Sequence, residues 1–477
     1  MIVHDRTRLT AYSYFCDQPQ RGSNMENKMG VMPIGRLLAN MSAPPMVSML
    51  AVALYNIVDS IFVARVSENA LTAVTLVFPI QMFVMSINVG IGVGLTSLIS
   101  RRLGEKRQGD AESAAVHGFF FAFVTWILYV LFAIFAAGPF IQLFTGTQGQ
   151  GEIYEMALIY CRIVMIGSLF LNVSITIKRI LQATGNTFHP MLFNIIGVGV
   201  NTILAPILII GYFGAPSLGV AGAGYAAVIG QGTGLAVALC ILFSRKHAVR
   251  VSFKGFKPRL EITRDILVVG VPTIVMNAAM PILISLLNKL LFSYGSAVFI
   301  LGVYFRISTF VILPVIGLNN GALPIMGYNF GAKNRLRLVA TYKTAIAVAL
   351  IIMIAGTAIF WVFPDRIMTI YSATGDTFDM GVHALRVISL CWIPGAFTII
   401  SIGMMQALAH GGFALIITLV RQLGFVLPLA YFLLTRFGVY GYWYAFSVAE
   451  VFALVITALF VRYIFKKEIN KLPEGVK

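Results

Sequence analysis

Long apolar stretches separated by short polar connections dominate the amino-acid sequence. Stretches such as 345–363 and 451–461 are apolar on almost every side of a helix, whereas membrane strands would show short alternating segments. A membrane-spanning helix needs roughly 20 apolar residues. The pattern therefore predicts an all-α integral membrane protein with twelve transmembrane helices, near 36–64, 70–99, 113–137, 154–180, 189–212, 219–244, 266–292, 297–327, 338–363, 382–409, 412–435 and 439–465.

The composition agrees with this pattern. Of the 477 residues, 58% are hydrophobic and 11% are charged, and the mean hydropathy is +0.87. Soluble domains average about 45–50% apolar and about 25% charged residues, so a soluble enzyme, a disordered chain and a secreted disulfide scaffold are excluded. The four cysteines are far apart and indicate neither disulfides nor a metal cluster. We expect no metal and no cofactor.

The net charge of +17 is distributed in a way that predicts membrane orientation. Lys and Arg gather after or at the ends of spans two, four, six, eight and twelve, and the alternate connections are nearly bare or acidic. Such an excess of positive charge marks cytoplasmic loops. Both termini are therefore predicted in the cytoplasm, with the spans in the plasma membrane of a prokaryote. Nucleic-acid binding is not expected, because the basic residues are not gathered on a soluble face.

The second half of the chain repeats the first. At a constant offset of 227 residues, prolines and glycines pair between the halves: Pro45 with Pro272, Gly90 with Gly317, Gly94 with Gly321, and Gly104 with Gly331. Each half has an even number of spans, so the halves share one topology and are related by an axis along the membrane normal, which is a transporter design. The alternative is a duplication that only builds a larger bundle.

The repeat predicts the following organisation: a disordered tail (1–30), an N-lobe of six helices (31–244), a basic cytoplasmic linker (245–264), a C-lobe of six helices (265–466) and a cytoplasmic tail (467–477).

Asp59 is the strongest candidate for chemistry. It is the only Asp or Glu well inside a span of the first half, and it lies roughly 9 Å below the outer end of that span. An intramembrane carboxylate costs about 2.5–3.5 kcal/mol on insertion scales and is a functional-site candidate by default. It could carry a proton inward or hold a sodium ion. The alternative is a carboxylate satisfied by a neighbouring amide. Asn56 and Asn201 are its candidate neighbours.

Other polar residues within the spans are weaker candidates. Lys289, Arg306, Arg421 and Glu450 are expected to pair with each other or with helix-end carbonyls, with a gating role as the alternative. A cavity between the lobes is expected to be lined by amide, hydroxyl, aromatic and Met side chains, which suit organic cations. Its candidate asparagines are Asn56, Asn172, Asn194 and Asn288. No GxxxxGK[ST] motif occurs, which favours an ion gradient as the energy source.

Several short motifs resemble the multidrug and toxic compound extrusion (MATE) family, in its DinF-like and MepA-like branch. They are YNIVD at 55–59, GIGVG at 90–94 with RRLGEK at 101–106, QATGN at 182–186 and PIMGYNFGAK at 324–333. The resemblance covers about residues 30–465. It implies a V-shaped pair of six-helix lobes and cation antiport that drives the export of organic cations.

The sequence departs from the family at the coupling-ion site that the resemblance implies. That site combines the span-one Asp with an Asn and a second Asp in span five and a Thr in span six. Asp59 and Asn201 match the pattern, but Ala205 and Ala227 stand where the second acid and the Thr are expected. Sodium needs several hard oxygen ligands. Proton coupling through Asp59 is therefore favoured over sodium coupling.

The sequence thus predicts a monomeric secondary exporter of amphipathic organic cations, coupled to protons, in the lipid bilayer. Two alternatives stay open: sodium-coupled antiport of the same substrates, and a flippase for lipid-linked saccharides, which would favour a strongly basic cavity. An enzyme is not expected, because no cluster of His, Asp or Ser is found at a membrane face.

Overall fold

Long apolar helices make up nearly all of the computed structural model. It describes residues 27–64, 67–145, 151–214, 216–244, 247–254 and 256–474, without the side chains of 55–61, 63–64, 68 and 143–145. In these residues eleven helices are long and apolar enough to cross a membrane, or twelve if one bent pair counts as a single span. The prediction of an all-α membrane protein is confirmed. The predicted disordered tail lies almost wholly outside the described residues.

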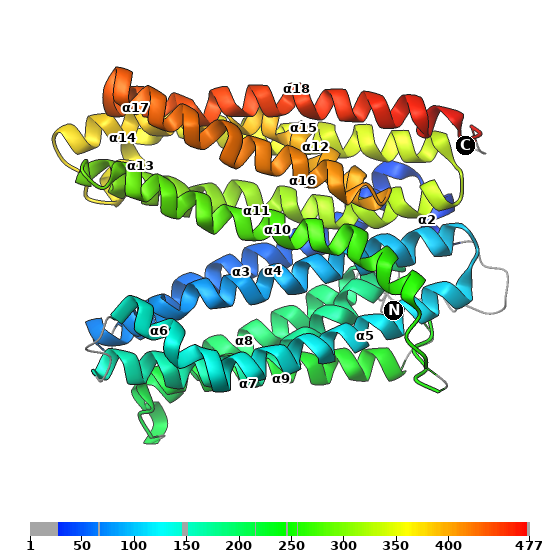
Figure 1. Cartoon of the computed structure of the whole chain (residues 1–477), viewed down its shortest axis with the longest axis horizontal. Helices are drawn as coiled ribbons and strands as arrows, with labels where there is room; N and C mark the ends of the chain where they lie inside the picture. Colours follow the sequence, from blue (N-terminus) through cyan, green and yellow to red (C-terminus); the bar gives the residue numbers. More distant parts are fainter. Residues whose placement is uncertain are drawn as a thin grey trace, which may run out of the picture.

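The N-lobe forms the lower half of the molecule in Figure 1. Its elements are α3 (Ile34–Ala64), α4 (Glu68–Gly104), α5 (Gln108–Leu131), the π-helical turn η1 (Phe132–Ala136), α6 (Ala137–Thr145), α7 (Glu152–Ala183), α8 (Phe188–Ile210), the 3-10 turn η2 (Tyr212–Gly214) and α9 (Gly219–Ser244). The first helix, α3, stays a single helix through Pro44 and Pro45.

The C-lobe forms the upper half in Figure 1. Its elements are α10 (Leu260–Leu291), α11 (Gly295–Gly331), α12 (Arg335–Val362), α13 (Pro364–Ile370), α14 (Asp376–Ser389), α15 (Trp392–Ala407), α16 (Gly411–Leu419), the π-helical segment η3 (Val420–Val426), α17 (Leu427–Tyr442), α18 (Tyr444–Lys467) and η4 (Ile469–Lys471). Because α10 begins at Leu260, the last residues of the predicted linker are helical.

Two spans of the C-lobe are interrupted. The tenth span consists of α14 and α15, which bend by 42° at their junction. The eleventh contains η3, and near its far end Gly438 adopts φ 68° and ψ −164°, a conformation that only glycine tolerates readily. The direction of the chain changes there, so the last span effectively begins just after Gly438.

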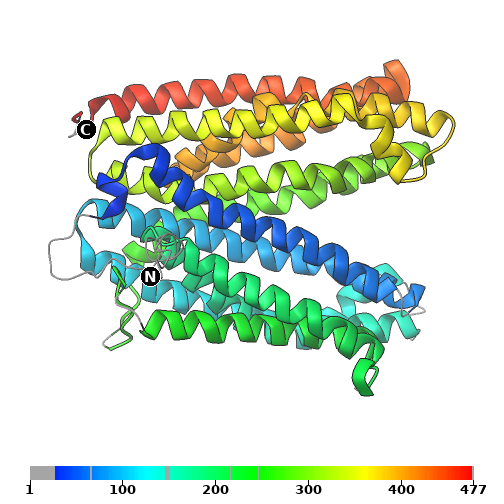
Figure 2. The same cartoon turned by 180° about the vertical axis from the view of Figure 1, so that it is seen from behind.

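The short helix α2 (Lys28–Val31) precedes the N-lobe but contacts the C-lobe (Figure 2). The Arg337 guanidinium donates from Nη2 to the carbonyl oxygens of Met29 and Met32, at 3.2 and 2.6 Å. The buried amide of Asn329 also donates to the Met29 carbonyl, at 3.1 Å. The chain is therefore attached to the C-lobe before it enters α3.

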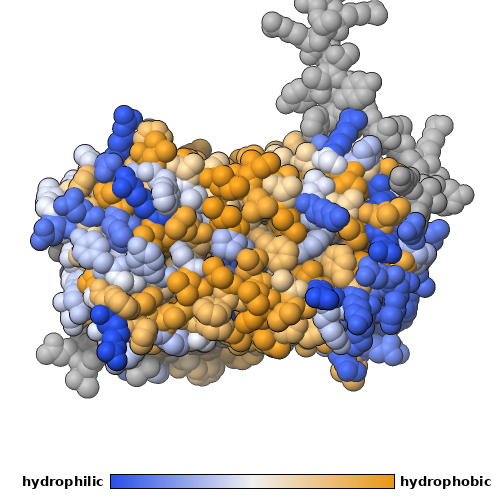
Figure 3. All heavy atoms as spheres, turned by 90° about the horizontal axis from the view of Figure 1, so that it is seen from above, coloured by the Kyte–Doolittle hydropathy of each residue, from blue (hydrophilic) through white to orange (hydrophobic). Residues whose placement is uncertain are grey.

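Hydrophobic residues form a band across the middle of the molecule, and hydrophilic residues gather at both ends (Figure 3). Exposed side chains such as Phe135, Ile351 and Leu459 belong to this surface, as expected for helices in contact with lipid. We name the end where α4 and α11 finish and where residues 247–259 join the lobes the linker end. The other end is the opposite end.

Candidate functional site

The glycines that repeat between the halves lie where the two lobes touch. A Cβ atom added at Gly90 on α4 would stand 2.6 Å from the Gly270 carbonyl oxygen on α10. At the equivalent Gly317 on α11, it would stand 2.6 Å from the Met46 Cα on α3. Contacts this close are possible only without a side chain. The two contacts are related by the internal repeat, and we name this contact region the interlobe seam.

The seam continues to the linker end. A Cβ at Gly104 would overlap the Tyr328 carbonyl oxygen, and one at Gly331 would overlap the Arg101 carbonyl oxygen. The ends of α4 and α11 therefore meet each other directly, and each helix contributes the glycine that admits the other. All these contacts lie in the halves of α3, α4, α10 and α11 nearest the linker end.

Hydrogen bonds join the lobes along the same seam. Ser97 on α4 donates from its hydroxyl to the Gln406 carbonyl oxygen at 2.6 Å. The buried Arg179 on α7 donates from Nη1 to the Asn320 side-chain oxygen on α11 at 3.1 Å, while its Nε has no hydrogen-bond partner. From the sequence, Arg179 counted only among the positive charges at the end of span four, so its contact with the other lobe was missed.

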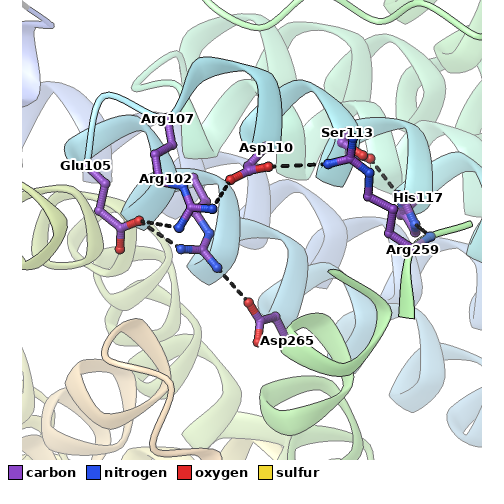
Figure 4. Close-up of polar contacts among 8 residues, drawn as sticks. All are labelled: Arg102, Glu105, Arg107, Asp110, Ser113, His117, Arg259 and Asp265. Carbon is purple, nitrogen blue, oxygen red and sulfur yellow. Dashed lines mark hydrogen bonds and ion pairs between the residues drawn. The ribbon is translucent and has the colours of Figure 1, made fainter. Parts of the chain in front are cut away.

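An ion pair closes the seam at the linker end. Arg102 on α4 contacts Glu105 at 2.8 Å within the N-lobe and Asp265 on α10 at 2.9 Å (Figure 4). The Asp265 contact crosses between the lobes. Both side chains are partly exposed, so this bond contributes modestly to stability, but it exists only while the lobes are together at this end.

The same helix faces become exposed toward the opposite end. Phe83 precedes Gly90 by seven residues, Phe310 and Arg306 precede Gly317 by seven and eleven, and Asn277 follows Gly270 by seven. Seven and eleven residues are close to whole numbers of helical turns, so these residues share the faces that carry the seam. Phe83 is 56% exposed and Phe310 40%, and Arg306 and Asn277 are also exposed. The lobes therefore touch at one end and diverge toward the other (Figure 1).

Asp59 and Asn56 lie on α3, but their side chains are outside the described part of the structure. Asn201 on α8 is buried against Gly230 of α9, and its side-chain oxygen has no hydrogen-bond partner. Its neighbour one turn on, Ala205, is also buried. Within the described part of the N-lobe, the amide oxygen of Asn201 is thus buried and free to accept a hydrogen bond or to ligate a cation.

The other candidate asparagines lie in different environments. Asn194 donates to the Ser48 hydroxyl at 2.7 Å, between α8 and α3. Asn172 is buried between α4, α5 and α7, where it accepts from Asn88 at 2.9 Å and donates to Thr125 at 3.2 Å. It lines a small pocket inside the N-lobe rather than the faces that diverge. Asn288 is half-buried on α10, eighteen residues after Gly270 and on the same face.

The candidate charges of the C-lobe fall into two groups. Arg421, in the π-helical segment η3, contacts Glu450 of α18 at 3.3 Å. Glu450 lies about 18 Å from the turn at Gly438, near the middle of the span. Lys289 and Arg306 are exposed and form none of the ion pairs found in the described residues.

Removing Arg421 is expected to destabilise the protein more than removing Glu450. The Glu450 side chain is 8% exposed and that of Arg421 is 22% exposed, so Arg421→Met leaves the more buried charge without a partner. Breaking a buried pair costs about 3–5 kcal/mol, and we expect Arg421→Met near the lower figure and Glu450→Gln below it. Thermal unfolding in detergent measures both.

The double variant Arg421→Met/Glu450→Gln is the control for that comparison, because it leaves no unpaired charge. We expect it to regain most of the stability lost in Arg421→Met. Additive losses in the double variant would show that the two side chains do not stabilise each other.

Within the described ranges no group of three or more His, Cys, Asp or Glu side chains could hold a metal ion. The features from which a function can be inferred are the repeated two-lobe structure, the seam at one end and a few intramembrane polar groups.

The MatE family model matches the chain twice, at residues 44–207 and 269–432, once in each lobe. The chain belongs to the MatE family. Both matches together cover more than half of its length, and they follow the internal repeat seen in the glycines. The family resemblance inferred from the motifs is confirmed, and the protein is a multi-pass membrane transporter.

Curated relatives and solved structures agree with this membership. The multidrug export protein MepA of Staphylococcus aureus (strain MSSA476) is 24% identical over 442 residues, which are 92% of this chain and 95% of the relative. MepA of Staphylococcus haemolyticus (strain JCSC1435) is 25% identical over 440 residues, with the same coverage.

Two solved structures match over 94% of this chain and all of theirs, each at 26% identity. One is described as the outward-facing conformation of a multidrug resistance MATE family transporter of the MOP superfamily, with a TM-score of 0.87. The other is a MOP superfamily transporter from Pyrococcus furiosus with a TM-score of 0.85, for which a reversed polarity of the binding pocket is said to suggest a different function.

Proposed function

We propose that this MatE family protein is a multidrug exporter that moves amphipathic organic cations out of the cell in exchange for protons. The two lobes alternately open a shared pathway to either side of the membrane. The observation that carries this proposal is the interlobe seam. The seam glycines repeat between the lobes and hold them together at the linker end, whereas the same faces of the described helices diverge toward the opposite end, so one pathway is closed at the first end and exposed at the second.

The positive charge of the linker end supports a cytoplasmic location for it, because Lys and Arg are enriched in cytoplasmic loops. The described conformation is then open to the outside. In the opposite conformation the seam opens, and the Arg102–Asp265 and Arg179–Asn320 contacts break. Both termini lie in the cytoplasm in this proposal.

The likeness to MepA supports drug-like cargo, since those relatives are described as multidrug export proteins. The diverging faces carry aromatic side chains such as Phe83 and Phe310, which attract organic cations. Arg306 lies on the C-lobe face and repels cations. We therefore expect the cargo to bind nearer the N-lobe, whose helix α3 contains Asp59.

Two observations support protons as the coupling ion. Ala205 and Ala227 supply no side-chain oxygen where the family pattern has a carboxylate and a hydroxyl, and the buried Asn201 oxygen alone makes a poor sodium site. A proton needs only one carboxylate, and Asp59 provides it. Sodium coupling of the same transport is the second candidate.

The deciding experiment is ethidium uptake into inside-out vesicles that contain the full-length protein. Either a proton gradient or a sodium gradient is imposed, with vesicles lacking the protein as the control. We expect the proton gradient alone to drive uptake. Uptake with sodium only would overturn proton coupling. No uptake with either gradient would overturn the drug-cation assignment and favour a flippase for lipid-linked saccharides.

A further inference from the structure

Residues 247–254 and 256–259, which lie between the lobes in the sequence, fold back onto the start of α5. Arg259 donates from its backbone amide to His117 Nε2 at 2.8 Å, and its side chain contacts Asp110 at 3.5 Å (Figure 4). Arg250 donates from its backbone amide to the Glu112 carboxylate at 3.3 Å. Val249 is fully buried beneath them. The segment is therefore a fixed part of the N-lobe surface.

A pocket of about 300 Å³ opens between this segment and α5. Its lining includes the cations Arg250, Lys254, Lys257 and Arg259. Asp110 is already paired with Arg107 and Arg259, and Glu112, in the lining, accepts hydrogen bonds from Gln108 and from the Arg250 amide. Arg250, Lys254 and Lys257 take part in none of the ion pairs among the described residues. The pocket thus carries an excess of positive charge.

Aromatic side chains place the pocket at the edge of the bilayer. Phe256 lies edge-on to His117, with ring centroids 5.0 Å apart, and Phe253 lies edge-on to Phe119 at 5.6 Å. Phe253 is still 58% exposed. Exposed Phe beside Lys and Arg suits the boundary between the lipid headgroups and the acyl chains.

An apolar stripe on α5 continues from the pocket into the membrane band. Ser113 and Val116 line the pocket, and Phe120, Phe123 and Ile127 follow on the same face at spacings of three and four residues. The last three are all exposed. A free anion would use only the charged pocket, whereas a lipid would also cover this stripe.

We propose that this pocket binds an anionic phospholipid, with the phosphate among Arg250, Lys254 and Lys257 and an acyl chain along Phe120, Phe123 and Ile127. Basic pockets beside transmembrane helices suit such headgroups. A bound lipid would hold the linker segment against the N-lobe at the membrane surface. The site is separate from the interlobe seam and does not depend on the identity of the cargo.

The test is native mass spectrometry of the full-length protein in detergent, titrated with phosphatidylglycerol or phosphatidylcholine. We expect the first phosphatidylglycerol to bind at least about tenfold more tightly than the first phosphatidylcholine. In Lys254→Gln/Lys257→Gln this preference falls about tenfold. Lys466→Gln/Lys467→Gln is the matched control, because it removes two exposed cations at the same end of the C-lobe and should keep the preference.

Three results would overturn the proposal. The first is equal binding of the two lipids by the unaltered protein. The second is an equal loss in both double variants, which would reflect overall charge only. The third is displacement of phosphatidylglycerol by inorganic phosphate at millimolar concentration, which would make the pocket a phosphate site that does not recognise lipid.

Discussion

Asp59→Asn is expected to reduce proton-driven ethidium uptake at least about tenfold, to the level of vesicles without the protein. The amide has nearly the shape of the carboxyl group but cannot bind and release a proton near neutral pH. Without that step, the inward movement of protons no longer drives the outward movement of cargo. Folding should not suffer, because the substitution removes a charge that costs about 2.5–3.5 kcal/mol to place in a membrane span.

Asp365→Asn is the matched control for this experiment. Asp365 is an exposed acid in the first turn of α13, at the opposite end of the C-lobe, and its removal should leave uptake unchanged. Ethidium binding by the purified Asp59→Asn protein distinguishes lost coupling from lost cargo binding. Uptake equal to that of the unaltered protein at equal expression would refute the role assigned to Asp59.

The fold was predictable because membrane helices can be recognised from the length and the apolar composition of sequence segments. The predicted first span, 36–64, falls within α3, and the fifth, 189–212, differs from α8 by no more than two residues at either end. The repeat was also visible, since glycines and prolines are infrequent enough for a constant offset to stand out. Backbone hydrogen bonds cannot be left open in lipid, so each apolar stretch of this length has to be a helix.

The orientation of individual side chains was not predictable in the same way. A helix that is apolar on all sides gives no signal of which face meets the other lobe, so Asn172 was assigned to a cavity between the lobes although it bonds to Asn88 and Thr125 inside the N-lobe. The break between α14 and α15 was missed because the two helices together have the length and the composition of one membrane span. Arg179 was missed because basic residues at a helix end already have an explanation in membrane orientation.

The repeat of the seam glycines was visible in the sequence, but the helices that they contact could not be predicted from it. Glycines in membrane helices allow close helix packing, but packing within a lobe and packing between lobes require the same residues. The structure places Gly90, Gly104, Gly317 and Gly331 between the lobes. In the alternating access that we propose, two halves that separate and rejoin need a contact surface without interlocking side chains, and main chain against main chain provides one.

Gly94→Ala is therefore expected to prevent the lobes from closing at the linker end. A Cβ at this position would overlap the Ile266 carbonyl oxygen on α10, which belongs to a helix backbone and cannot swing aside. Overpacking of this kind costs about 1–3 kcal/mol, so the population of the closed seam should fall by about tenfold, and transport with it. Gly321→Ala, its equivalent in the repeat, would meet the Met41 carbonyl oxygen at 2.6 Å and should behave alike.

Gly199→Ala provides the matched control, because it lies inside α8 and a Cβ there meets nothing within 4 Å. All three changes replace a helical glycine by alanine and gain about 1 kcal/mol of helix propensity, so only the seam variants should lose transport.

Nitroxide labels on Lys106→Cys and Lys333→Cys, in a background without the native cysteines, report the distance between the lobes at the linker end. We expect that distance to increase in Gly94→Ala and Gly321→Ala and to stay constant in Gly199→Ala. An unchanged distance in both seam variants would mean that the lobes tolerate a side chain between their backbones, and the seam could not then be the surface along which they separate.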